Sequence, residues 1–325
     1  AMLFDHMVDL AQLLLLEGIA GYRAPSPHDT SMVIPSGSDR LWIPLVTMLG
    51  GLLSGFIVYR WAPEAEGHGT DAALAAYHTE AGEMRSRIPF VKAIASALTI
   101  GSGGVAGREG PTAQIAVGLG AIAGRWLGLR GQERRTLLLA SMAAGLAAMF
   151  RAPLGMAIFA VEILYAGMVF ESEALIYTVI AAVTAYAVYG FFNGWEPLFD
   201  FPEGLGLEHP FELVGYALLG ILAGVVAALL PVLLYRARDL FLRMPGPPHI
   251  RPASGGLIVG LGAMAAPEIL GTGYGWIELA VVGQLSLASV LILLLAKGPA
   301  MAITIGSGGS GGVFAAPVTL GAMLG

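Results

Sequence analysis

The chain has 325 residues, of which 56% are hydrophobic and 12% are charged, and its formal net charge is −6. Because a soluble domain has about 25% charged residues, this composition excludes water as the main surroundings of the chain. The acidic balance gives no basic footprint for nucleic acid, and the absence of cysteine excludes disulfides and thiolate metal sites. We expect no metal site and no cofactor.

Apolar segments follow one another along the whole chain. In order, they lie at residues 8–20, 41–61, 88–100, 110–128, 136–149, 153–169, 173–192, 211–241, 253–266 and 286–305. A helix needs about 20 residues to cross a bilayer. The stretches at 41–59, 174–192 and 213–235 approach or exceed that length. The sequence therefore predicts an all-α polytopic membrane protein.

Several of the other segments are too short to span a bilayer, and glycine or proline interrupts them. Such short, broken segments point to a binding site near the middle of the membrane. The 46 glycines fit this interpretation, because small residues let membrane helices approach closely. Proline and turn formers dominate the polar stretches, which we expect to be connections at the water interface: 23–40, 62–87, 193–210 and 243–252.

Two glycine-rich stretches in distant parts of the chain resemble each other. GSGGVAGREGP at 101–111 returns as GSGGSGGVFAAP at 306–317, and each follows an apolar segment. We interpret them as parts of an internal repeat, with halves at about 1–200 and about 205–325. Two halves that each carry a glycine-broken helix are typical of transporters. We expect a single transmembrane domain over 1–325, in a natural protein that is longer at both ends.

These glycine stretches can bind an anion through their backbone. The first N–H groups of a helix are unpaired, and the peptide dipoles place about half a positive charge there. Glu109 stands at the start of the helix that Pro111 opens. Its carboxylate would compete with the anion when ionised and vacate the place when protonated, which makes Glu109 a candidate gate and proton acceptor. The alternative is an ordinary ion pair between Arg108 and Glu109 in a loop.

An enzyme of another class is a second alternative. GGSG at 308–311 resembles the serine motif of rhomboid-type intramembrane proteases, with Ser310 as the nucleophile and His68 or His249 as its partner. That interpretation leaves the duplication and Glu109 unexplained, so we do not expect an enzyme.

The motifs resemble those of the CLC family of chloride channels and chloride/proton antiporters. GREGP at 107–111 is similar to the family's gating-glutamate motif, and GSGGVFAAP at 309–317 to its second anion-binding motif. Between them, AAGLAAMFRAPLGMAIFAVEIL at 143–164 resembles the segment around the family's Ala-Pro-Leu turn. The resemblance implies two inverted-topology repeats of broken and tilted helices, and a homodimer with one pore per subunit.

Carried over by the resemblance, Glu109 is the gate, and backbone amides in both halves bind chloride. The implied anion-binding residues are Arg108, Gly110, Val313, Phe314 and Ala315, with motif glycines at Gly67, Gly69, Gly107, Gly311 and Gly312. Phe314 is implied to line the path.

The chain departs from the family pattern at three places. Where the family usually has Gly-Ser-Gly-Ile-Pro, this chain reads GHGTD at 67–71, so His68 either faces the anion or pairs with Asp71 or Glu66. At the inner proton relay, Glu162 matches the first glutamate of a pair, for which we favour a structural role, and Ile163 occupies the relay position. The family's C-terminal tyrosine ligand would lie beyond residue 325.

We therefore expect chloride transport across the cell membrane, with protons as a coupled partner. Passive channel behaviour remains an alternative because of Ile163, and a fluoride-selective member is another because of GHGTD.

Overall fold

The computed structural model describes residues 1–35, 37–78, 82–165, 172–199, 206 and 209–325. Within these ranges the regular elements are helices, and strand pairing is limited to isolated bridges. The α-helices are α1 Met2–Gln12, α2 Trp42–Trp61, α3 Thr70–His78, α4 Ile88–Gly101, α5 Glu109–Trp126, α6 Gly131–Phe150, α7 Pro153–Tyr165, α8 Ser172–Asn193, α9 Glu212–Leu242, α10 Ile250–Ala265, α11 Tyr274–Val281, α12 Leu287–Gly306 and α13 Ala315–Leu324. A π-helical turn follows α1 at Leu13–Glu17, and 3-10 turns lie at Gly37–Leu41, Pro63–Ala65 and Pro267–Ile269.

The prediction of membrane-spanning helices is confirmed. Among the described residues, four helical stretches are long and apolar enough to cross a bilayer: Gly37–Trp61, Ala174–Asn193, Glu212–Leu242 and Leu287–Gly306. Shorter apolar helices lie at Ile88–Gly101, Pro153–Ile163, Ile250–Ala265 and Ala315–Leu324. These short helices include α4, which leads into the first glycine stretch, and α13, which follows the second.

Some elements depart from the prediction. The supposed connection at 62–87 contains α3, whose Ala73, Ala76 and Tyr77 are buried in the core, and two further helices, α11 and α13, had no predicted segment. All three are ten residues or shorter, which is too short for a hydropathy pattern to separate them from loops. Residues 166–169 of one predicted segment, and most of the expected boundary near 200–210, lie outside the described residues. The division into halves stays a prediction.

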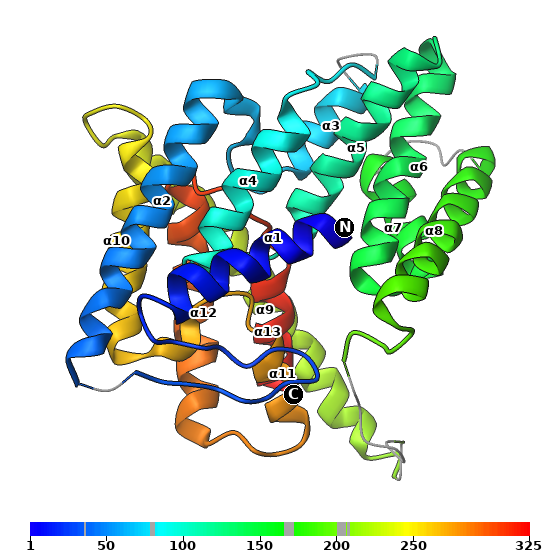
Figure 1. Cartoon of the computed structure of the whole chain (residues 1–325). Helices are drawn as coiled ribbons and strands as arrows, with labels where there is room; N and C mark the ends of the chain where they lie inside the picture. Colours follow the sequence, from blue (N-terminus) through cyan, green and yellow to red (C-terminus); the bar gives the residue numbers. More distant parts are fainter. Residues whose placement is uncertain (36, 79–81, 166–171, 200–205, 207–208) are drawn as a thin grey trace.

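Glycines bring α2 and α10 into direct backbone contact, and the two helices lie side by side (Figure 1). A Cβ atom on Gly51 would collide with the Pro252 carbonyl, and one on Gly256 would collide with the carbonyl of Thr47. The high glycine content therefore serves close helix packing in this pair, as expected for a membrane interior.

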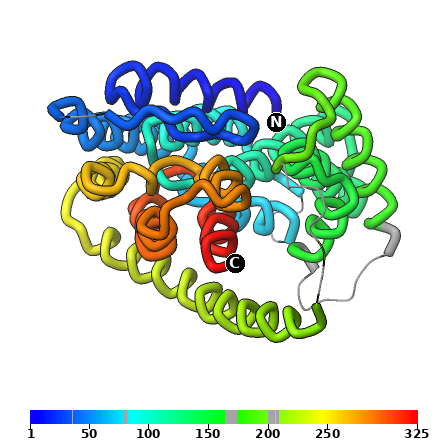
Figure 2. Tube along the Cα trace, turned by 90° about the horizontal axis from the view of Figure 1, so that it is seen from below, coloured from blue at the N-terminus to red at the C-terminus, as the bar shows by residue number. Residues whose placement is uncertain are grey.

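The molecule has two distinct faces. Seen from below, α1 and the segment after it lie along one face, and α9 runs along the opposite one (Figure 2). The glycine stretches lie between these faces, each joining two helices: α4 to α5 in the first half and α12 to α13 in the second.

Candidate functional site

The two glycine stretches pair with each other through their backbones. The Gly107 N–H donates to the Gly312 carbonyl at 2.8 Å, and the Gly312 N–H donates to the Gly107 carbonyl at 2.7 Å. Directly after this bridge, α5 begins at Glu109 and α13 begins at Ala315. Two helix N-termini, each with unpaired N–H groups, therefore start beside the same bridge.

The two stretches also fold alike. Gly103 and Gly308 have φ values of 99° and 96°, in the left-handed region that favours glycine. In the first loop Gly104 N–H donates to the Thr99 carbonyl at 2.9 Å, and in the second Gly309 N–H donates to that of Thr304 at 3.1 Å. The sequence repeat is thus a repeat of backbone conformation.

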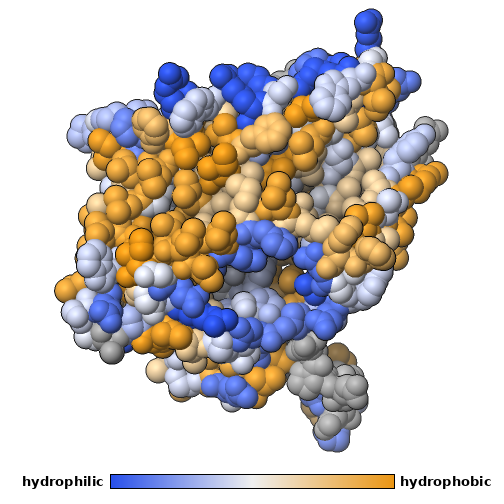
Figure 3. Space-filling model, viewed as in Figure 1, coloured by the Kyte–Doolittle hydropathy of each residue, from blue (hydrophilic) through white to orange (hydrophobic). Residues whose placement is uncertain are grey.

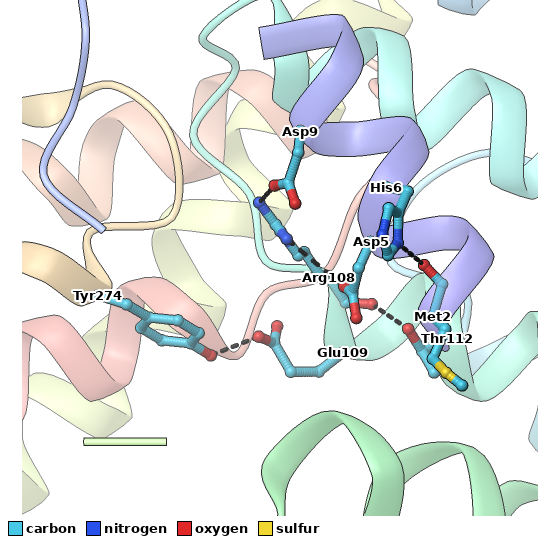
Figure 4. A network of polar contacts seen from close by, with 8 residues as sticks. All are labelled: Met2, Asp5, His6, Asp9, Arg108, Glu109, Thr112 and Tyr274. Atoms are coloured by element: carbon cyan, nitrogen blue, oxygen red, sulfur yellow. Dashed lines mark hydrogen bonds and ion pairs between the residues drawn. The ribbon is translucent and has the colours of Figure 1, made fainter. Parts of the chain in front are cut away.

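Glu109 is buried beside the bridge, with 3% of its surface exposed. Its Oε1 accepts a hydrogen bond from the Tyr274 hydroxyl (Figure 4), whereas its Oε2 has no hydrogen-bond partner in the described part of the chain. The carboxylate belongs to the first residue of α5, where the first N–H groups of the helix have no intrahelical partner. A Cβ on Gly107 would collide with Oε2, so this position must be glycine for the carboxylate to fold back over it.

Arg108 points away from Glu109. Its guanidinium Nη2 lies 2.6 Å from Oδ1 of Asp9, and its Nη1 lies 3.5 Å from Oδ1 of Asp5, both on α1 (Figure 4). The alternative of a local Arg108–Glu109 ion pair is therefore wrong. The two side chains diverge because the carboxylates that neutralise Arg108 come from the N-terminal helix.

A cavity of about 370 Å³ reaches this site from the face that carries α1. We call it the α1-side vestibule; its lining includes Asp5, Asp9, Arg108, Arg151, Tyr189 and Tyr274. In the view with α1 in front, hydrophilic side chains surround a hollow in the middle of this face (Figure 3).

A second cavity, of about 220 Å³, lies next to α9 on the opposite side. This α9-side vestibule is lined by residues that include Glu64, Glu66, His68, Asp71, Tyr235 and Arg238. The carbonyl of His68 packs so closely on Gly110 that a Cβ there would collide with it. One vestibule thus reaches Tyr274, which bonds Glu109, and the other reaches His68, which packs against the residue after Glu109.

The His68 ring is held by its own loop. Its Nε2 lies 3.2 Å from Oδ2 of Asp71, and its Nδ1 lies 3.3 Å from the Thr70 hydroxyl. Of the two interpretations of His68, the structure shows the pairing with Asp71. The ring nevertheless lines the α9-side vestibule, and its flanking glycines, Gly67 and Gly69, have φ values of 69° and 87°.

The remaining predicted anion ligands lie around the bridge. Phe314 precedes α13 and packs edge-on against Phe150 at 4.9 Å between ring centroids. Ala315 is buried in a small cluster with Tyr274, and Val313 packs against a larger apolar cluster. The Gly311 N–H donates to the Gly67 carbonyl at 3.1 Å, so this amide already has a partner.

Sequence reasoning missed a second duplication. Residues 62–69 read APEAEGHG and residues 266–273 read APEILGTG, and each forms a 3-10 turn followed by a glycine loop. A fully buried lysine holds each turn. Lys92 Nζ donates to the carbonyls of Ala65 at 3.1 Å and Gly67 at 2.6 Å. Lys297 Nζ donates to three carbonyls, those of Ile269 at 2.8 Å, Leu270 at 3.2 Å and Gly271 at 2.9 Å.

The turns bind crosswise. The Gly67 carbonyl in the first turn accepts a hydrogen bond from the Gly311 N–H in the second glycine stretch. In the second turn, the Gly271 N–H donates to the Gly103 carbonyl in the first glycine stretch at 3.3 Å. The sequence does carry a signal for these paired turns, the repeated A-P-E-x-x-G-x-G pattern, with a lysine at the same place before each glycine stretch. Tyr274 directly follows the second copy of this pattern.

The structure does not bring Ser310 to a histidine. Its hydroxyl donates to the Ala65 carbonyl at 2.8 Å and lies 3.0 Å from the Ser96 hydroxyl. The His68 ring pairs with Asp71, and the His249 ring lies edge-on to Phe56. Ser310 is thus bonded as part of the core, without the base that a serine nucleophile needs.

Ile163, at the position that corresponds to the inner proton relay, has apolar surroundings. Ile163 on α7 packs against the large core cluster around α5 and α6, while the preceding Glu162 is exposed. No proton acceptor is supplied by this side chain.

The voltage gated chloride channel family model matches residues 50–325 of this chain. An H⁺/Cl⁻ exchange transporter ClcA from Yersinia pestis bv. Antiqua (strain Angola) is 32% identical over 99% of this chain and 66% of its own length. The chain thus spans just under two thirds of the length of this relative.

Two solved structures share the fold. A slow cyanobacterial Cl⁻/H⁺ antiporter matches with a TM-score of 0.82 and 22% identity, over 98% of this chain and 72% of its own. A CLC-type fluoride/proton antiporter matches with a TM-score of 0.71 and 22% identity, over 88% and 82%. The chain is therefore an integral membrane protein that belongs to the voltage gated chloride channel family, the CLC family.

Proposed function

We propose that the protein moves chloride across the membrane in exchange for protons, along a path gated by Glu109. The observation that carries this proposal is the buried Glu109 carboxylate, which lies at two paired helix N-termini between vestibules on opposite faces. The exchange activity named for the Yersinia relative agrees with it.

The geometry gives the carboxylate and a chloride ion the same place. Helix N-termini bind an anion by dipoles and N–H groups, weakly enough for it to leave again. The carboxylate folds back over Gly107 at the start of α5, so an ionised Glu109 occupies the position that an anion would take. A protonated Glu109 has no charge to hold it there, so protonation of the carboxylate is coupled to its movement out of the anion position.

We assign the anion contacts to the free ends of α5 and α13. The proposed ligands are the amides of Arg108, Gly110, Val313, Phe314 and Ala315, with Phe314 lining the path and His68 at the α9-side entrance. The amides of Gly107, Gly311 and Gly312 instead hold the backbone together, because they donate to carbonyls of the opposite half or turn. These glycines shape the site without binding the ion.

The test uses the full-length natural protein in proteoliposomes loaded with chloride. Chloride efflux and proton uptake are recorded together for the wild type, for Glu109→Gln and for Glu162→Gln as a matched control on an exposed glutamate. We expect Glu109→Gln to abolish proton uptake and to leave a chloride flux that no longer depends on pH, with the control unchanged. An unaltered, pH-dependent flux in Glu109→Gln would contradict the gate.

Ile163 supports a second candidate, a passive gated channel. A neutral, core-packed side chain at the relay position supplies no carboxylate that could carry a proton there. Chloride flux without proton uptake in the wild type would establish this candidate in place of the exchanger. Replacing chloride by fluoride in the same assay decides the selectivity.

We further propose that the protein functions as a homodimer in the cell membrane and has no enzymatic activity. The mass of the detergent-solubilised full-length protein tests the dimer. Absence of peptide cleavage that depends on Ser310 tests the lack of protease activity.

A further inference from the structure

We propose that Tyr274 is a positioning residue that latches Glu109 across the path in the closed state. The role rests on the function proposed above and adds a residue from the second half of the chain to the gate of the first. The two residues are 165 positions apart in sequence, and both side chains are buried.

The contact is specific to one oxygen of the gate. Tyr274 donates its hydroxyl hydrogen to Oε1 of Glu109, and Oε2 has no partner in hydrogen-bonding geometry. Among the described residues, Tyr274 is thus the side chain that fixes the direction of the carboxylate. Hydrogen bonds to an ionised group are about twice as strong as neutral ones, so the latch acts on the ionised gate more than on the protonated one.

The backbone around Tyr274 prevents the hydroxyl from following Glu109. Tyr274 begins α11 directly after Gly273, whose φ of 93° only glycine adopts readily. The Lys297 ammonium donates hydrogen bonds to three carbonyls that precede this glycine in the chain. Lys297 also packs closely on Gly273, because a Cβ there would lie 3.0 Å from Lys297 Cε. On its other side, the Tyr274 ring meets the Phe199 ring edge-on at 5.3 Å. When Glu109 moves away, the hydrogen bond must break.

Among the described residues, the repeated motif of the first half has no equivalent latch. The repeated motif places Thr70 where the second half has Tyr274, and the Thr70 hydroxyl meets Nδ1 of His68. The glycine repeat likewise places Phe314 where the first half has Glu109, and a phenyl ring cannot accept this bond. The gate is therefore held from the α1-side vestibule, which Tyr274 lines.

The other charged group next to Glu109 is already neutralised. Arg108 precedes Glu109 and is paired with Asp5 and Asp9 of α1. Tyr274 from α11 and Arg108 from the start of α5 are the titratable groups that act on the carboxylate. Loss of the tyrosine hydroxyl therefore removes the side-chain donor that the described residues give this carboxylate, without disturbing the ion pairs around Arg108.

The experiment compares Tyr274→Phe in the wild-type and Glu109→Gln backgrounds, with chloride flux from proteoliposomes of the full-length protein as the readout. Losing a hydrogen bond to a charged group is expected to shift the gate equilibrium about tenfold or more. We therefore expect Tyr274→Phe to raise the flux about tenfold where the gate is ionised, and to move the half-maximal flux to higher pH. In the Glu109→Gln background the same substitution should change nothing.

Tyr22→Phe is the matched control, because it removes a buried tyrosine hydroxyl that has no hydrogen-bond partner among the residues the structure describes. Equal effects of Tyr274→Phe in both backgrounds, or no effect in either, would overturn the latch. If Tyr274→Phe does not fold, 3-fluorotyrosine at position 274 serves instead; as the stronger donor it should lower the flux, and an unchanged flux would count against the latch. A wild type without chloride flux would reject the proposed function itself, which is a different outcome.

Discussion

The turn at 62–69 and the glycine stretch at 101–111 share a backbone arrangement with their counterparts at 266–273 and 306–317, and the two sets differ in the side chains they carry. In both, a buried lysine holds a 3-10 turn, and the turn supports a glycine stretch of the opposite half. At the helix start, one half presents Glu109 and the other Phe314. The repeated backbone is thus similar in both places, and the side chains at this position make the proposed gate one-sided.

The largest expected effect is on stability, and it distinguishes the two buried lysines, Lys297 and Lys92. Lys297→Met leaves two buried carbonyls and the part-buried carbonyl of Gly271 without another donor among the described residues. By contrast, the Ala65 and Gly67 carbonyls bonded by Lys92 also accept from Ser310 and Gly311. Since an unsatisfied buried polar group costs about 1–3 kcal/mol, we expect Lys297→Met to destabilise the protein by about 3 kcal/mol or more. Lys92→Met should cost clearly less. Thermal unfolding in detergent compares them, and equal losses would contradict the difference.

Substitutions at the two bridge glycines, Gly107 and Gly312, are expected to affect different properties, the proposed gate in one case and the backbone bridge in the other. A Cβ on Gly107 meets the flexible end of Glu109, so Gly107→Ala should displace the carboxylate and give a chloride flux as independent of pH as that of Glu109→Gln. A Cβ on Gly312 meets backbone, at 2.9 Å from both the Gly107 oxygen and the Gly110 nitrogen. Gly312→Ala should therefore reduce the flux itself by forcing the halves apart. Flux against pH for both variants distinguishes these outcomes, and identical profiles would reject the distinction.

Ser310 tests whether the second glycine stretch is held as part of the core. Ser310→Ala removes one donor to the Ala65 carbonyl, which keeps its bond from Lys92. We expect a loss of about 1 kcal/mol in the free energy of unfolding and a normal chloride flux. Loss of flux at unchanged stability would instead assign Ser310 to the path.

The smallest effect is expected at His68. Its Nε2 contacts the carboxylate of Asp71, which is 73% exposed, and even a fully charged pair at such exposure contributes about 0–1 kcal/mol. His68→Ser should leave unfolding nearly unchanged, and Asp71→Asn should behave alike. A change in the chloride-to-fluoride flux ratio in His68→Ser alone would show that the ring turns to the anion during transport.

The sequence by itself determined the helices and the chemistry of the glycine stretches. Long apolar runs, glycine spacing and a single glutamate in an apolar setting are local properties, so α2, α9 and α12 and the role of Glu109 as a buried carboxylate could be predicted without coordinates. Short helices such as α3 could not, because burial of their few residues depends on neighbours elsewhere in the chain.

Only the tertiary structure decided the partners. Adjacent in sequence, Arg108 and Glu109 turn in opposite directions, one to Asp5 and Asp9 on α1 and the other to Tyr274. Composition cannot show this, because a hydrogen bond requires two groups within about 3 Å, and which loops come that close is set by the packing of helices distant in sequence. The sequence thus specifies that a charge is buried, and the fold specifies what holds it.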